Sequence, residues 1–133
     1  TQRSTLFPYT TLFRSIRERL EWASAVTTVD AELGRRELAR IRALTDALLQ
    51  PGDVLCVPTS PRVAPMKNET ADKIEVEFRH QAMCLLCIAG LGGLPQISLP
   101  LASLDGLPLG VSLIGRRGSD RELLALASRV MRR

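Results

Sequence analysis

Residues 90–126 read GLGGLPQISLPLASLDGLPLGVSLIGRRGSDRELLAL, and this stretch decides the fold. Its glycines and proline at 90–95 end a preceding helix, and the apolar runs 96–101 and 109–114 are predicted strands. Between the two runs, Asp105-Gly106 is the dipeptide that most strongly favours a two-residue hairpin turn. Ser119, followed three residues later by Glu122, predicts a capping box at the start of a helix over 119–131.

Upstream of this stretch the periodicity predicts three helices and one strand. The helices span 16–29, 35–50 and 75–89, the strand spans 54–57, and Gly34 marks a break between the first two helices. The third helix becomes apolar on all sides by Cys87, so we expect it to be buried. Turn signals bound the strand, which we also expect to be buried. The fold class is α/β, with helices packed on a small mixed sheet.

Composition excludes two classes of partner. The 133 residues carry a formal charge of +4, and the excess is mixed with acids on the predicted helix faces. Because aromatic residues are only 4% of the chain, nucleic acid is not an expected partner. The apolar stretch 82–101 has the length of a membrane span, but its glycines and prolines would break a helix there. No membrane partner is expected either.

The three cysteines are expected to be reduced, small and buried. An odd number without a secretory signal indicates a reducing compartment, and we expect a cytoplasmic protein. The spacing of His80, Cys84 and Cys87 would place them on one helical face and suggests a metal site. A structural zinc needs four ligands, and the remaining cysteine, Cys56, lies in a predicted buried strand. The preferred interpretation is therefore core packing, with no metal.

The first fifteen residues differ from the rest. Residues 5–15, TLFPYTTLFRS, resemble the translation of a sequencing-adapter oligonucleotide joined in frame to a truncated gene. A transit peptide is the competing interpretation, whereas Pro8 and the threonines interrupt any secretory-signal core. We therefore predict that residues 1–15 are a disordered artefact and that residues 16–133 carry the fold.

Five short motifs, taken in order, resemble the C-terminal part of the amidase-signature family. They are Val57-Pro58-Thr59, Gly93-Leu94-Pro95, Ser98-Leu99-Pro100, Leu107-Pro108-Leu109-Gly110 and Gly118-Ser119-Asp120. The resemblance covers roughly residues 30–131 and is closest to stand-alone amidases of the indoleacetamide-hydrolase-like type. It implies an incomplete C-terminal portion of a longer fold. It also implies that the parent protein hydrolyses small carboxylic amides to an acid and ammonia or an amine, without a cofactor.

The family's catalytic triad has no counterpart in this chain. That triad is Ser–Ser–Lys, with its serines in and near a Gly-Gly-Ser-Ser motif. Here the pair Gly92-Gly93 is followed by Leu94-Pro95, and the only lysines, Lys67 and Lys73, lie outside any strand-like or Gly/Ser-rich segment. No catalytic residue is therefore assigned, and we expect the chain to be inactive alone.

Four residues are candidates for a substrate pocket. Thr59 and Ser60 lie where the chain leaves the predicted strand, a position that often lines a ligand crevice. The tRNA-dependent amidotransferase branch carries an acid about ten residues before its Gly-Leu-Pro, where this chain has Met83. Because no acid lies between Phe78 and Gln96, the resemblance implies an uncharged or apolar amide. Cys87 is the fourth candidate for the substrate pocket.

Two other functions remain open. One is a small non-catalytic binding domain that resembles an amidase, and the other is a small enzyme that uses Cys84 as nucleophile and His80 as base. The enzyme hypothesis is the weakest, because the pair lacks an oxyanion hole and a third orienting group. If the strands belong to a larger sheet in the parent, their free edges predict self-association of this chain.

Overall fold

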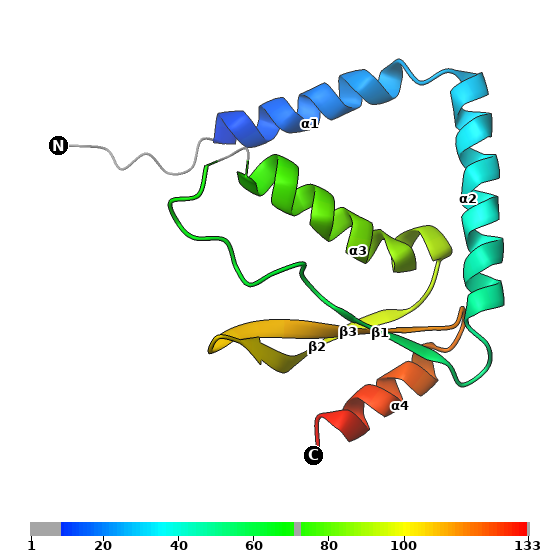
Figure 1. Cartoon of the computed structure of the whole chain (residues 1–133). Coiled ribbons are helices and arrows are strands. Elements are labelled where there is room, and N and C mark those ends of the chain that lie inside the picture. Colours follow the sequence, from blue (N-terminus) through cyan, green and yellow to red (C-terminus); the bar gives the residue numbers. More distant parts are fainter. Residues whose placement is uncertain (1–8, 71–72, 133) are drawn as a thin grey trace. The chain divides into compact units, whose positions relative to one another are not determined.

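The computed structural model describes residues 9–70 and 73–132, and these divide between two compact units, residues 1–37 and 38–133. The elements follow in the order α1 (Tyr9–Ser24), α2 (Thr28–Leu48), β1 (Val54–Pro58), η1 (Lys73–Phe78), α3 (Arg79–Gly92), β2 (Gln96–Leu104), β3 (Leu107–Gly115) and α4 (Asp120–Val130). The short η1 is a π-helical turn that leads into α3. The first unit holds α1 and the start of α2, and the second holds the sheet (Figure 1).

The first unit is helical, and α2 runs across the boundary between the units. Residues 9–15 of the segment predicted to be disordered form the start of α1, whereas residues 1–8 lie outside the described residues. The expected break at Gly34 is wrong, because α2 continues through it to Leu48. A single glycine costs a helix only about 1 kcal/mol relative to alanine, and the ion pairs of Glu32 with Arg35 and Arg36 support this turn.

The sheet has three strands in the order β1-β3-β2, and both pairings are antiparallel, where a mixed sheet was expected. The α/β class itself is confirmed. The predicted hairpin is also confirmed, because Asp105 and Gly106 adopt positive φ angles of 52° and 77°, as a type I′ turn requires. All three strands extend slightly beyond their predicted bounds.

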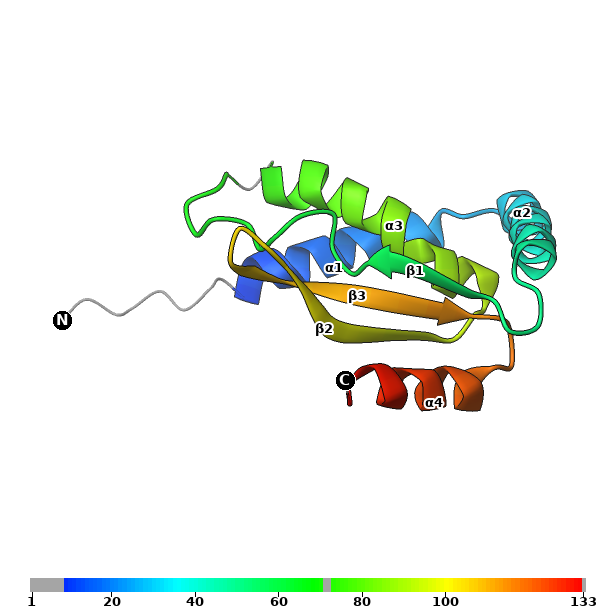
Figure 2. The same ribbon diagram turned by 60° about the horizontal axis from the view of Figure 1, so that its bottom comes forward.

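The sheet packs helices against both of its faces (Figures 1 and 2). On one face, Ile114 packs with Leu49, which follows α2, and with Ala89 of α3 and Leu94. On the other, Leu99 and Leu113 pack against two residues of α4, Leu123 and Ala127. We call these the α3 face and the α4 face. Alternation along β3 explains the division, since Leu113 and Ile114 point to opposite sides.

Three expectations about burial are wrong. Of α3, only Ala89 and Gly92 are buried, although its second half is apolar on all sides. Cys56 and Cys84 are exposed rather than part of the core, and Cys87 is half-buried. The strand β1 is an edge strand with no fully buried residue. The physical reason is common to all three: the second unit provides too few layers to cover these apolar surfaces.

The ends of α3 and α4 use different capping chemistry. Gly93 ends α3 in the left-handed region at φ 64°, as the glycine-rich turn predicts. The expected capping box at α4 is wrong, because the Ser119 hydroxyl donates to the Arg116 carbonyl at 2.6 Å and makes no cap hydrogen bond. Across the described residues, no helix combines the length and apolar character needed to cross a membrane.

Candidate functional site

Four polar side chains meet on the α3 face of the sheet. Ser112 in β3 is fully buried, and its Oγ lies 2.8 Å from Thr59 Oγ1 and 3.0 Å from Ser98 Oγ. The Gln96 side-chain amide donates to the same oxygen over 2.9 Å. We call these four residues the polar cluster.

The hydrogen-bonding capacity of Ser112 is filled by these contacts. A serine hydroxyl offers one donor and two acceptor positions. Gln96 Nε2 uses one acceptor position, so Thr59 and Ser98 take the other two, one as donor to Ser112 and one as acceptor from it. This pattern makes a buried hydroxyl compatible with an otherwise apolar face.

A β-bulge brings the cluster together. The turn at Asp105-Gly106 places Leu104 opposite Leu107, and this register would put Ser98 opposite Leu113. The register shifts by one residue between Leu99 and Ala102, and Ser98 therefore lies directly opposite Ser112. A shift of one residue moves every side chain to the other face of the sheet. The sequence analysis did not group Gln96, Ser98 and Ser112. Pro100 is the one sequence signal of the bulge that brings them together, and it does not show which residues will meet.

Thr59 is held at the exit of β1 from two sides. Its N–H donates to the Gly110 carbonyl at 2.8 Å, and its hydroxyl belongs to the polar cluster. A Cβ on Gly110 would lie 2.8 Å from Thr59 Oγ1, so the glycine leaves the space that the threonine side chain occupies. Thr59 is thus fixed in both backbone and side chain at the carboxyl end of β1.

The loop after Thr59 is fastened by its own contacts. The Ser60 hydroxyl donates to the Arg62 carbonyl at 2.6 Å. The Arg62 guanidinium binds both carboxylate oxygens of Glu69 at 3.1 and 3.2 Å and lies 5.2 Å from the centre of the Phe78 ring. A two-point arginine–carboxylate contact fixes direction as well as distance. The loop that carries Ser60 is therefore joined to the end of η1, directly before α3.

The other two predicted pocket residues lie on α3. Met83 is exposed and Cys87, one turn later, is half-buried. That these two line one pocket with Thr59 and Ser60 stays a prediction. Near them, His80 Nε2 is 3.7 Å from Cys84 Sγ. Within residues 9–70 and 73–132, no three His, Cys, Asp or Glu side chains are grouped so that they could hold a metal ion.

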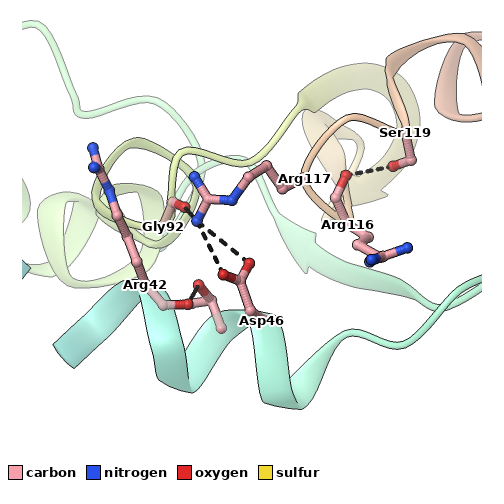
Figure 3. A network of polar contacts seen from close by, with 7 residues as sticks. Arg42, Asp46, Gly92, Arg116, Arg117 and Ser119 are labelled. Atoms are coloured by element: carbon pink, nitrogen blue, oxygen red, sulfur yellow. Dashed lines mark hydrogen bonds and ion pairs between the residues drawn. The ribbon is translucent and has the colours of Figure 1, made fainter. Parts of the chain in front are cut away.

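A second polar arrangement, centred on Arg117, joins three segments of the second unit. Arg117, in the loop between β3 and α4, donates to the Gly92 carbonyl at 2.8 Å and to both Asp46 carboxylate oxygens at 3.3 and 3.4 Å (Figure 3). A Cβ on Gly93 would lie 2.8 Å from Arg117 Nη1. Arg117 therefore ties the ends of α2 and α3 to the start of α4.

The described surface also has a pocket of about 490 Å³ beside this arrangement. It is bounded by the turn at 51–54, the loop at 116–119 and one side of α4, including Leu123. Because Leu123 belongs to the α4 face, this pocket and the polar cluster lie on opposite sides of the sheet.

The polar cluster can orient a polar group but contains no activated nucleophile. All four of its side chains are neutral, and each contact of Ser112 goes to another hydroxyl or to an amide. Nucleophilic catalysis by serine needs a base within hydrogen-bond reach. None of the hydrogen bonds described for Ser112 involves a lysine or histidine.

The chain resembles amidases in sequence and in structure. The family model described as Amidase matches residues 7–124. Amidase 1 from Arabidopsis thaliana is 36% identical over 84% of this chain, and Amidase 1 from Oryza sativa is 42% identical over 65% of it. The solved structure of allophanate hydrolase from Kluyveromyces lactis superposes with a TM-score of 0.68 at 30% identity over 87% of this chain.

The matched region is a small part of these relatives. The chain spans 20% of the length of the rice protein, 26% of the Arabidopsis protein and 19% of the allophanate hydrolase.

Proposed function

Because this chain belongs to the amidase family, as the match over residues 7–124 establishes, we propose that it is a C-terminal portion of an enzyme that hydrolyses carboxylic amides. The observation that carries this proposal is the combination of that match with coverage of only about a quarter or less of each relative compared above. The products would be a carboxylic acid and ammonia or an amine. The reacting groups of a Ser–Ser–Lys triad would come from the remainder of the parent enzyme, and no cofactor is proposed.

The contribution of this chain would be to shape the substrate pocket. Thr59 and Ser60 would take this role from the carboxyl end of β1, and the hydrogen bonds that hold both hydroxyls there support it. Met83 and Cys87 would add an uncharged surface from α3, whose sequence contains no acid. A carboxylate would be needed to bind an ammonium group. We therefore propose an uncharged or apolar amide as the substrate class.

The chain alone should have no amidase activity. Purified protein would be incubated with aryl acetamides and with indole-3-acetamide, and release of ammonia would be measured. We expect no turnover above buffer. Turnover that disappears on replacing a serine of this chain by alanine would contradict the proposal, because the nucleophile would then lie within it.

A chimaera tests the positive part of the proposal. Residues 30–124 would replace the matching segment of Amidase 1 from Arabidopsis thaliana, with the truncated enzyme as the control. We expect amide hydrolysis by the chimaera and none by the control. In the chimaera, Thr59→Val should raise KM more than Thr59→Ser, because Ser keeps the hydroxyl bonded to Ser112. A chimaera with the circular-dichroism spectrum and cooperative melt of Amidase 1 but no activity would contradict the proposal.

Two further points concern the cellular location of the protein and the origin of residues 1–15. We propose a cytoplasmic location, which the three free cysteines support. The relatives include one named as a chloroplast outer envelope protein, so cell fractionation of the full-length parent is the test. The interpretation of residues 1–15 as an artefact stays a prediction, and the family match itself begins at residue 7.

A further inference from the structure

The hydrogen bonds of the polar cluster depend on one another in direction. The Gln96 amide donates to Ser112 Oγ at 2.9 Å and fills one of its two acceptor positions. Ser112 then has one O–H to donate and one acceptor position left, for Thr59 at 2.8 Å and Ser98 at 3.0 Å. If Ser112 donates to Ser98, Thr59 must donate to Ser112, and the reverse arrangement frees the Thr59 O–H. The state of Ser112 therefore decides whether Thr59 can accept or donate elsewhere.

Ser112 can influence a ligand only through Thr59. Ser112 is fully buried, so no ligand reaches its hydroxyl. Thr59 lies half-buried at the carboxyl end of β1, where its N–H is already bound to the Gly110 carbonyl. Because the backbone of Thr59 is fixed in this way, the remaining freedom is rotation of its side chain and of its O–H bond. The contact with Ser112 controls both rotations.

An uncharged amide makes one of the two arrangements useful. Its carbonyl oxygen accepts hydrogen bonds, whereas the N–H groups of primary and secondary amides donate them. Negative charge develops on the carbonyl oxygen during hydrolysis, and the donors that stabilise it would come from the catalytic portion of the parent enzyme. The N–H groups still need an acceptor, because a buried donor without a partner is costly. Met83 and Cys87 offer only weak sulfur acceptors, so a hydroxyl oxygen suits the N–H better.

We propose that Ser112 is a positioning residue for the amide substrate. It accepts a hydrogen bond from the Thr59 hydroxyl, donates one to Ser98, and so holds the Thr59 oxygen as an acceptor for a substrate N–H. This inference rests on the proposed function, in which Thr59 lines the substrate pocket. It gives the site a means of preferring an amide to an ester of the same acid, since the ester has no N–H.

The first test uses the full chain and needs no assay of activity. Three-bond NMR couplings of the Thr59 side chain report whether it occupies one χ1 rotamer or several. We expect one rotamer in the unmodified chain and averaged couplings in Ser112→Ala, because the contact that holds the hydroxyl is gone. Ser103→Ala makes the same change at an exposed position of β2 and should leave the couplings unchanged. A single Thr59 rotamer in folded Ser112→Ala would overturn the inference.

A double-mutant cycle in the chimaera with Amidase 1 tests whether Ser112 acts through Thr59. Thr59→Val and Ser112→Ala should each raise KM for indole-3-acetamide several-fold and change kcat less. The double variant should have about the KM of Thr59→Val alone, because Ser112 would have no hydroxyl left to orient. KM increases that multiply in the double variant would show that Ser112 acts by another route.

Ser98→Ala tests the direction of the hydrogen bonds and covers the case in which Ser112→Ala fails to fold. Without Ser98, the buried Ser112 hydroxyl can donate only to Thr59, since Gln96 is itself a donor. The Thr59 O–H would then face the substrate N–H. We expect kcat/KM in the chimaera to fall several-fold for indole-3-acetamide but not for methyl indole-3-acetate. Ser98→Thr keeps the hydroxyl and should keep the amide-to-ester ratio, whereas an unchanged ratio in Ser98→Ala would contradict the inference.

These experiments separate the role of Ser112 from the proposed function. A chimaera without any activity would count against the proposed function, whereas the Thr59 couplings of the chain alone do not depend on activity. An active chimaera in which Ser98→Ala and Ser112→Ala behave like Ser103→Ala would overturn the role of Ser112 and leave the proposed function standing.

Discussion

At the scale of single residues, the second unit depends on a few residues whose hydrogen bonds or backbone conformation suit one residue type best. Ser112 illustrates this for a polar group, since it is fully buried and three side chains converge on its hydroxyl. Gly93 illustrates it for the backbone, because its φ of 64° disfavours most side chains and a Cβ there would displace the Arg117 guanidinium. Each gives a prediction with a control of the same chemical type.

Replacing Ser112 by Ala should destabilise the fold by about 1–3 kcal/mol, because Gln96, Thr59 and Ser98 would each lose a buried hydrogen-bond partner. Ser103→Ala is the control, since Ser103 is exposed on the same hairpin and should change the free energy of unfolding by less than about 0.5 kcal/mol. Guanidinium melts of both variants provide the measurement. Equal losses would mean that the polar cluster contributes nothing specific to stability.

Replacing Gly93 by Ala should cost about 1–3 kcal/mol, because alanine is strained at positive φ and its Cβ would displace Arg117. Gly90→Ala is the control within the same helix. Gly90 has ordinary helical geometry and open space where a methyl group would be added, so alanine there should stabilise by about 0.5–1 kcal/mol. Thermal melts should therefore move in opposite directions, and a shared direction would contradict the explanation.

At the scale of elements, the start of α2 shows reciprocal capping. The Thr27 hydroxyl donates to Asp30 Oδ2 at 2.6 Å, the Thr27 N–H donates to the same oxygen at 3.1 Å, and the Asp30 N–H donates back to the Thr27 hydroxyl at 3.2 Å. Two free amides at the helix start are thereby satisfied. The carboxylate also lies in the first turn, where the helix dipole favours negative charge.

These hydrogen bonds give the helix start a pH dependence. The Thr27 side-chain hydrogen bond, followed by its backbone hydrogen bond, lowers the pKa of Asp30 below its ordinary value of 3.8. A lowered folded-state pKa means that the stabilisation is complete above the ordinary value and is lost as pH falls through the folded value. Carbon NMR of the Asp30 carboxyl should show this lowered pKa. Thr27→Val should move the pKa back toward 3.8 and Thr27→Ser should not, whereas identical titrations would exclude the hydroxyl as the cause.

The elements themselves could be read from the sequence because their signals are local. Asp105-Gly106 and the glycines near 92 end or connect elements by backbone geometry alone, and both act where they were predicted. The polar cluster could not be read in this way. Its members come from three strands, and the bulge at Leu99/Ala102 decides which of them meet. Thr59 was predicted as a site residue from its position at a strand end, while Ser98 and Ser112 were not predicted as site residues.

Burial was predicted least well, because it depends on how many layers a chain supplies. An apolar helix such as α3 is usually covered on all sides, yet Met83 is 51% exposed. Cys56 is exposed for a related reason, since nothing in the described residues pairs with the outer edge of β1. The apolar periodicity of a sequence indicates which side chains favour burial. It does not indicate whether the chain supplies the elements that would cover them.

At the scale of the whole molecule, the buried residues gather in one of the two units. Both apolar clusters lie within residues 38–133, and α2 has no buried residue. Ser112, the buried polar residue, belongs to the same unit. The stability of the fold should therefore come from the second unit.

Deleting residues 1–15 should change the free energy of unfolding by less than about 1 kcal/mol, the scale of one ordinary destabilising mutation. The reason is that the described side chains of α1, from Ile16 to Ser24, are all exposed. Thermal unfolding of the shortened and full-length chains would be compared. A larger loss would show that these residues belong to the fold and would contradict the artefact interpretation.

The last prediction concerns the small size of the core. Eighteen large apolar side chains are exposed in the described residues, against eight buried apolar residues, two of which are alanine. Each well-buried large side chain contributes only about 1.5–3 kcal/mol, and the entropy of ordering the chain opposes the sum. We therefore expect a shallow guanidinium transition and strong binding of 1-anilinonaphthalene-8-sulfonate, whose fluorescence reports exposed apolar surface. A monodisperse monomer with one sharp transition and no dye binding would instead favour a complete, independent binding domain over a portion of an amidase.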